Sequence, residues 1–136
     1  MKADIANDLQ PTVALVETAI NTDTSTPGAS VDTADFEAGI MFAMAISNYS
    51  AGDFQLVIQE SDDDGGSDPW TNIGAENYTV GPDTVSADTG SNPMVKAGAF
   101  STKQFLRPVV VSTNSGDATA AVFTVMKAEL RPTPTP

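Results

Sequence analysis

The chain of 136 residues contains no histidine and no cysteine. Without imidazole it cannot form a serine–histidine triad, a histidine-ligated metal site or an imidazole proton shuttle. Without thiols it cannot form disulfides, zinc–thiolate sites or cysteine nucleophiles. These two absences exclude most familiar enzyme mechanisms, and we predict that the protein is not an enzyme.

Positive charge is also scarce, because six Lys and Arg stand against eighteen Asp and Glu, for a net charge of −12. Such a surface repels phosphate backbones and anionic lipid headgroups, so nucleic acid is not an expected partner. The longest uncharged apolar run, Ala38 to Ile46, is far shorter than the roughly 20 residues that span a bilayer. Acidic residues stand where the apolar part of a secretion signal would lie, so we predict no signal and no membrane span.

Short apolar segments recur between Gly, Pro, Asn, Asp, Ser and Thr, and no long stretch has helical spacing. This pattern predicts one all-β domain, a two-sheet antiparallel β-sandwich of the jelly-roll kind with about seven or eight strands. Immunoglobulin-like connections would produce the same string of strands and stay open. We divide the chain into an N-terminal arm (1–11), a β-sandwich domain (12–130) and a Pro-rich tail (131–136), whose alternate prolines cannot join a ladder.

Two pairs of strands are predicted from alternation and turn residues. Residues 36–46 and 54–60 alternate on either side of a break at 48–53, which suggests an antiparallel pair, and a helix over 34–46 is disfavoured by Gly39. Residues 104–112 and 118–130 flank an Asn-Ser-Gly turn at 113–117, which predicts a hairpin. Further strands are expected over 12–18 and 94–100.

An acidic cluster, residues 62–68, places four carboxylates around two glycines. Oxygen ligands on a flexible turn suit Ca²⁺, and the candidate ligands are Asp62, Asp64 and Asp68. The spacing does not match an EF-hand loop, and Asp and Gly also favour exposed turns. We therefore predict a solvated hairpin tip without a cofactor, with Ca²⁺ binding as the alternative.

Trp70 and Arg107 are the other two notable side chains. Trp70 follows the acidic cluster at a strand start, where a core anchor is expected more often than a ring that stacks on a sugar. Arg107 lies within an apolar run, so it needs either a carboxylate partner in the chain or an acceptor across a subunit contact. Pro108 predicts that this strand is an edge or carries a bulge.

The order of these segments resembles a family of small tailed-bacteriophage virion proteins, the capsid decoration or cement (head-stabilisation) proteins. The resemblance covers most of the chain and ends in an Ala/Val-rich last strand and a Pro-rich tail. Its marks are Val31-Asp32-Thr33-Ala34-Asp35-Phe36-Glu37, Phe54-Gln55-Leu56-Val57-Ile58-Gln59-Glu60-Ser61-Asp62, Trp70-Thr71-Asn72-Ile73 and Lys96-Ala97-Gly98-Ala99-Phe100-Ser101-Thr102-Lys103-Gln104-Phe105-Leu106-Arg107-Pro108.

The resemblance implies a structural protein that bridges neighbouring major capsid protein subunits on the outer surface of a bacteriophage capsid. It also implies a homotrimer, made in the host cytoplasm and located in the virion. The expected capsid or subunit contacts are Ile5, Leu9 and Pro11 in the arm, together with Arg107.

Two rival functions belong to other classes. A carbohydrate- or receptor-binding head fibre module would gather Trp70, Tyr49 or Tyr78 on one exposed face. A hydrolase would need two carboxylates facing each other across a groove, at least one of them with a raised pKa.

Overall fold

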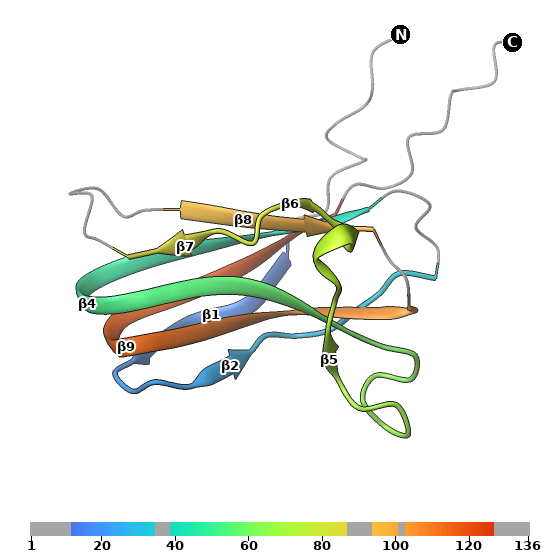
Figure 1. Ribbon diagram of the computed structural model, residues 1–136, viewed down its shortest axis with the longest axis horizontal. Coiled ribbons are helices and arrows are strands. Elements are labelled where there is room, and N and C mark those ends of the chain that lie inside the picture. Colours follow the sequence, from blue (N-terminus) through green and yellow to red (C-terminus); the bar gives the residue numbers. More distant parts are fainter. Residues whose placement is uncertain (1–11, 35–38, 87–93, 101–102, 127–136) are drawn as a thin grey trace, which may run out of the picture.

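The computed structural model describes residues 12–34, 39–86, 94–100 and 103–126, and their secondary structure is almost entirely β (Figure 1). Nine strands and one short 3₁₀ helix are present in these ranges, which confirms the all-β prediction and exceeds the expected seven or eight strands. The elements are β1 (Thr12–Ile20), β2 (Ser25–Pro27), β3 (Val31–Asp32), β4 (Ile40–Ser61), β5 (Thr71–Asn72), η1 (Ala75–Asn77), β6 (Tyr78–Val80), β7 (Thr84–Val85), β8 (Met94–Ala99) and β9 (Phe105–Met126).

All nine strands belong to one antiparallel sheet with the order β1-β9-β4-β8-β6. The short strands β2 and β3 pair with β9, and β5 and β7 pair with β4. The two 22-residue strands β4 and β9 form the spine, paired from Ile40 opposite Met126 to Ser61 opposite Phe105. Every other strand except β6 therefore pairs directly with one of these two.

Both spine strands bend at the same end of the molecule (Figure 1). Asn48 and Gly52 of β4 have positive φ values of 51° and 87°, and Asn114 and Ser115 of β9 have values of 57° and 58°. The β4–β9 register shifts between Ser47 and Asp53, at the same level. Asn and Gly tolerate this left-handed backbone, so the turn residues in the sequence lie where the paired strands fold back.

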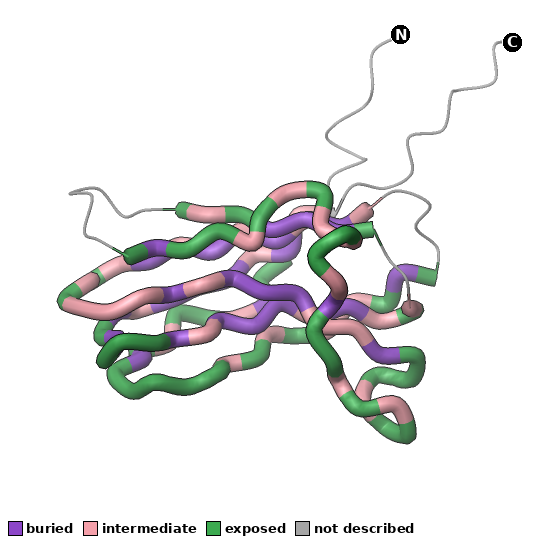
Figure 2. Tube along the Cα trace, in the orientation of Figure 1, coloured by how far each residue is buried: buried purple, intermediate pink, exposed green. Residues whose placement is uncertain are grey.

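The apolar core is one cluster that includes side chains from both halves of β4. Side chains before the β4 bend and after it are fully buried and belong to one apolar cluster (Figure 2), namely Phe42, Met44 and Ile46 before it and Phe54, Leu56 and Ile58 after it. Alternate residues of a strand point to the same face, so each half of β4 has one apolar face. The alternation seen in the sequence of these two segments is confirmed at these positions.

The two predicted strand pairs are wrong. Residues 40–46 and 54–60 are two halves of β4, and each half pairs with β9 rather than with the other half. The segments 105–112 and 118–126 are likewise two halves of β9. Turn residues in a sequence indicate where the chain reverses, but they do not indicate which strand each arm pairs with. Each half of β4 therefore hydrogen bonds to a half of β9, and neither strand pairs with itself across its bend.

Pro108 lies in the interior strand β9, and the β4–β9 register has no shift at this position, so neither the predicted edge strand nor a bulge in this pair is found. It pairs with Ile58, whose N–H donates to Tyr78 Oη and whose carbonyl accepts from the Ile73 N–H, both away from β9. Ile58 and Pro108 are therefore a non-hydrogen-bonded pair of the antiparallel ladder. On the other side, the Pro108 carbonyl accepts from the Gly28 N–H at 2.8 Å, in the break between β2 and β3. The proline nitrogen, which has no N–H, therefore lies toward the break between β2 and β3. No hydrogen bond between paired strands is lost at this position.

Several expectations fall outside the described residues. The arm 1–11 with Ile5, Leu9 and Pro11, the end of the predicted last strand (127–130) and the Pro-rich tail 131–136 belong to this group. Within the part of the chain that is described, no helix has the length and apolar character needed to cross a membrane.

Candidate interaction site at the acidic loop

The acidic loop, residues 61–70, follows the end of β4 and closes around a buried hydroxyl. Ser61 is fully buried, and its Oγ accepts the Gly65 N–H at 2.8 Å and donates to the Asp68 carbonyl at 2.7 Å. The Asp63 N–H also reaches this oxygen, at 3.3 Å. The hydroxyl of Ser61 therefore forms hydrogen bonds with backbone groups from both arms of the loop.

The carboxylate of Asp63 ties the tip of the loop together. Its Oδ2 accepts the Ser67 N–H, and its Oδ1 accepts the Asp68 N–H at 3.0 Å. Hydrogen bonds from backbone amides favour a charged carboxylate, so they lower the pKa of Asp63, with the Asp68 amide contributing most. Asp63 is therefore an internal brace of the loop.

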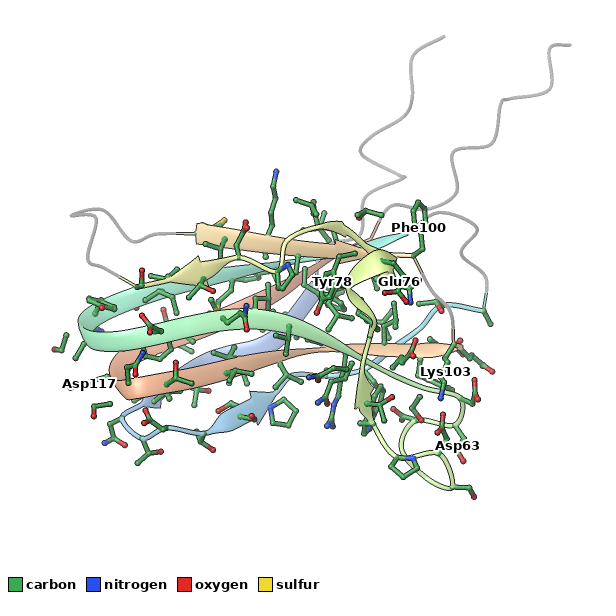
Figure 3. All side chains as sticks on the ribbon, viewed as in Figure 1. Asp63, Glu76, Tyr78, Phe100, Lys103 and Asp117 are labelled. Carbon is green, nitrogen blue, oxygen red and sulfur yellow. The ribbon has the colours of Figure 1, made fainter. Side chains whose placement is uncertain are left out.

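Lys103, just before β9, joins the acidic loop to the sheet (Figure 3). Its Nζ lies 2.7 Å from Asp68 Oδ2 and 4.0 Å from Asp62 Oδ2, and the Asp62 N–H donates to the same Asp68 oxygen at 2.8 Å. The Lys103 hydrogen bond lowers the pKa of Asp68, and the same contact raises the pKa of Lys103. The ammonium thus lies between two of the three carboxylates predicted as Ca²⁺ ligands.

The third predicted ligand, Asp64, is exposed and adopts a left-handed backbone with φ 60°. Its charge acts on Arg107 and raises the pKa of that guanidinium, while burial lowers it more strongly. Over residues 12–34, 39–86, 94–100 and 103–126, no three acidic side chains are grouped so that they could hold a metal ion. Ca²⁺ binding at this loop remains a prediction.

Arg107 lies beside the acidic loop and is held by a glutamine and a tryptophan. Its Nε and Nη2 donate to Gln59 Oε1 at 3.0 and 2.8 Å, and its Cζ lies 4.5 Å from the centre of the Trp70 ring. Gln59 Nε2 donates in turn to Asn72 Oδ1 at 3.0 Å. The register places Asn72, Gln59 and Arg107 opposite one another on β5, β4 and β9, so they form one polar row across three strands.

Trp70 is only partly buried and lies outside the core cluster, so the prediction of a core anchor is wrong. Its ring packs instead on Arg107 and on Gly65, where an added Cβ would lie 2.4 Å from the indole nitrogen. Gly65 also has a φ of 82°, which favours glycine. The ring therefore fastens the acidic loop over the polar row.

The aromatic side chains named for a carbohydrate site each have partners within the fold. Tyr49 packs edge-to-face on Phe54 and its hydroxyl lies 2.8 Å from the Gly52 carbonyl, at the bend. The Tyr78 hydroxyl accepts the Ile58 N–H at 2.9 Å, and burial raises its pKa. Both hydroxyls stabilise the fold, so the arrangement does not favour a sugar-binding face.

The carboxyl groups that the structure describes do not show the raised pKa that a two-acid hydrolase needs. Among the carboxyls that the structure describes, the resolved pKa shifts belong to Asp63 and Asp68, and both are downward. A general acid that works near neutral pH needs a shift in the opposite direction. Asp63 and Asp68 are charged carboxylates that are hydrogen bonded within the loop.

Sequence reasoning missed the residues that hold this site together, Ser61, Gln59 and Lys103. Lys103 lies 35 residues from Asp68, and Arg107 lies 48 residues from Gln59. The scarcity of cations was the available signal, because each lysine or arginine in an acidic chain is attracted to the densest group of carboxylates.

Comparison with known proteins finds no family model that matches this chain and no match among curated proteins. Function is therefore inferred from the geometry of the acidic loop and the polar row and from the resemblance of the sequence segments.

The acidic loop is expected to loosen in acid. The pKa values of Asp63 and Asp68 lie below their ordinary value of 3.8, so their stabilisation is present above about pH 4 and is lost as the pH falls through the lowered values. Trp70 is the sole tryptophan, so its fluorescence reports on the loop alone. We expect a reversible emission change below about pH 4, before global unfolding.

Asp63→Asn should shift the tryptophan emission toward that of the loosened loop already at pH 7, because the amide loses the charge that the two backbone donors stabilise. The control is Asp62→Asn, because the Asp62 carboxylate is exposed and lies 4.0 Å from Lys103. Identical emission for wild type and Asp63→Asn at all pH values would show that the brace is unimportant.

Proposed function

We propose that the protein is a structural, non-catalytic virion protein that decorates a bacteriophage capsid. In this proposal a homotrimer bridges neighbouring major capsid protein subunits on the outer surface, after synthesis in the host cytoplasm. The observation that carries the proposal is how the polar side chains of the acidic loop and of the polar row beside it are bonded. These side chains are committed to hydrogen bonds that brace a loop and a sheet face, which suits a contact surface rather than a reaction centre.

The folded sheet also offers an apolar edge for contact. β1 is the outermost strand beside β9, and its Val13 and Val16 are 54% and 70% exposed. The outer side of an edge strand carries backbone donors and acceptors that a partner strand can pair with. The capsid is the partner that we propose for this edge, since the proposed arm 1–11 directly precedes it in the sequence.

We further propose that the folded sheet is a jelly-roll-like sandwich, with β4 and β9 passing from one layer to the other at the bends. The shared core between the two halves of β4 supports this description. Such a rigid body keeps its surface groups in place without disulfides, which suits a protein with no cysteine.

The test combines the mass in solution with binding to capsids that lack the protein. We expect light scattering to give the mass of a trimer and co-sedimentation to be saturable. Calcium and a chelator are compared in the same series, and equal binding in both would show that the acidic loop needs no Ca²⁺ for this function. A protein that does not sediment with capsids at any concentration would overturn the proposal.

A further inference from the structure

The guanidinium of Arg107 is held in one plane and one orientation. Gln59 Oε1 takes two of the five N–H donors that a guanidinium carries, those on Nε and Nη2. Trp70 lies against the group at 4.5 Å, and Asn72 fixes the amide of Gln59. The side chain therefore loses little further conformational entropy when a ligand binds.

The end of the same guanidinium has the geometry that binds a carboxylate. With the Nε side committed to Gln59, the Nη1–Nη2 end presents the parallel N–H pair that matches two carboxylate oxygens. Within the described ranges no carboxylate lies within 4.0 Å of Arg107 to form an ion pair, whereas Lys103 has two. The Asp64 carboxylate acts on it electrostatically and raises its pKa, while burial lowers the pKa more strongly.

The net charge of the chain limits where two copies can meet. Each copy carries a net charge of −12, so two copies repel each other over most of their surfaces. The described cations are Lys96, Lys103 and Arg107, and Lys103 is bound to its own acidic loop. A contact between copies is least unfavourable at a preoriented cation, and arginine and tryptophan are enriched among the residues that dominate binding energies.

We propose that Arg107, backed by Trp70 and oriented by Gln59, receives an Asp or Glu carboxylate from a second copy of this chain. This inference rests on the proposed function, because the homotrimer is part of it. The Asp64 carboxylate acts electrostatically on the same guanidinium from within the chain. Removal of the Asp64 charge is therefore expected to strengthen the contact between copies. Loss of the parallel N–H pair of Arg107 is expected to weaken it.

The experiment measures the concentration dependence of the mass by light scattering for four proteins. Arg107→Lys keeps the charge but loses the bidentate fork, and we expect its dissociation constant for the trimer to rise at least tenfold. Asp64→Asn is expected to lower the constant severalfold. Lys96→Gln removes an exposed cation on β8 and is the matched control, with an unchanged constant expected. The midpoint of urea unfolding for each variant, measured at a concentration where it is monomeric, shows that it is folded.

An Arg107→Lys trimer as stable as wild type would overturn the inference, and so would a wild-type protein that is monomeric at all concentrations. Capsid co-sedimentation separates these outcomes from the function. A monomer that binds capsids leaves the decoration proposal standing without this contact. A trimer that depends on Arg107 and ignores capsids keeps the contact and removes the decoration proposal.

Discussion

Replacing Gly52 with alanine is expected to destabilise the protein by about 3 kcal/mol, the sum of left-handed backbone strain and overpacking. Gly52 lies at the bend of β4 with a φ of 87°, and an added Cβ would lie 2.3 Å from Gly116 Cα and 2.6 Å from Gly116 N. These atoms are backbone atoms of β9, so no side-chain rotation relieves the overlap. Glycine at position 52 therefore allows this close approach of the two spine strands, whereas a Cβ at Gly116 would meet the side chains of Ser112 and Phe54.

The measurement is the free energy of unfolding from urea titration, with Gly66→Ala as the matched control. An alanine at position 66 meets the Asp63 carboxylate at 3.3 Å, and Gly66 is exposed with no positive φ. We expect the control to change stability by less than about 1 kcal/mol. Equal effects of the two substitutions would show that the bend does not bring β4 and β9 into close contact.

Phe54→Ala is expected to cost about 3–5 kcal/mol of stability, the usual range for deletion of a buried phenylalanine. Phe54 follows the bend, is fully buried and belongs to the cluster that joins the two halves of the sheet. Its ring packs edge-to-face on Tyr49 with centroids 6.4 Å apart, and its Cζ would lie 3.0 Å from a Cβ at Gly116. Loss of this ring leaves a cavity at the point where the sheet folds over.

Phe100→Ala is the control for the same chemical change at the surface. Phe100 is 60% exposed, so its removal is expected to change stability by about 0.5 kcal/mol or less. Thermal unfolding of the two variants side by side gives the comparison. A Phe54→Ala protein as stable as the Phe100→Ala protein would contradict a single core shared by both halves of the sheet.

The inward faces of the strands were predictable because alternation records burial directly. Phe42, Met44 and Ile46 share one parity, and their strand is central between β9 and β8. The pairing was not predictable in the same way. Asn48 and Gly52 mark a reversal, but whether the two arms pair side by side or pack face to face depends on β9, which bends with them 62 or more residues later in the chain.

The candidate site was predictable in part for a related reason. The acidic cluster and the isolated cation at Arg107 are visible in composition, but their partners come from distant segments. Lys103 reaches Asp68 only after β9 returns beside β4, and Gln59 meets Arg107 through the same pairing. Long-range register, which no local pattern encodes, decides which polar groups meet.

The most direct test of the central claim is the number of copies bound per capsid at saturation. Purified capsids lacking the protein are titrated, and the bound copies are counted against the major capsid protein. The decoration proposal predicts a plateau that corresponds to trimers at a fixed set of equivalent positions on the outer surface. Binding that increases without a plateau, or no binding, would contradict it.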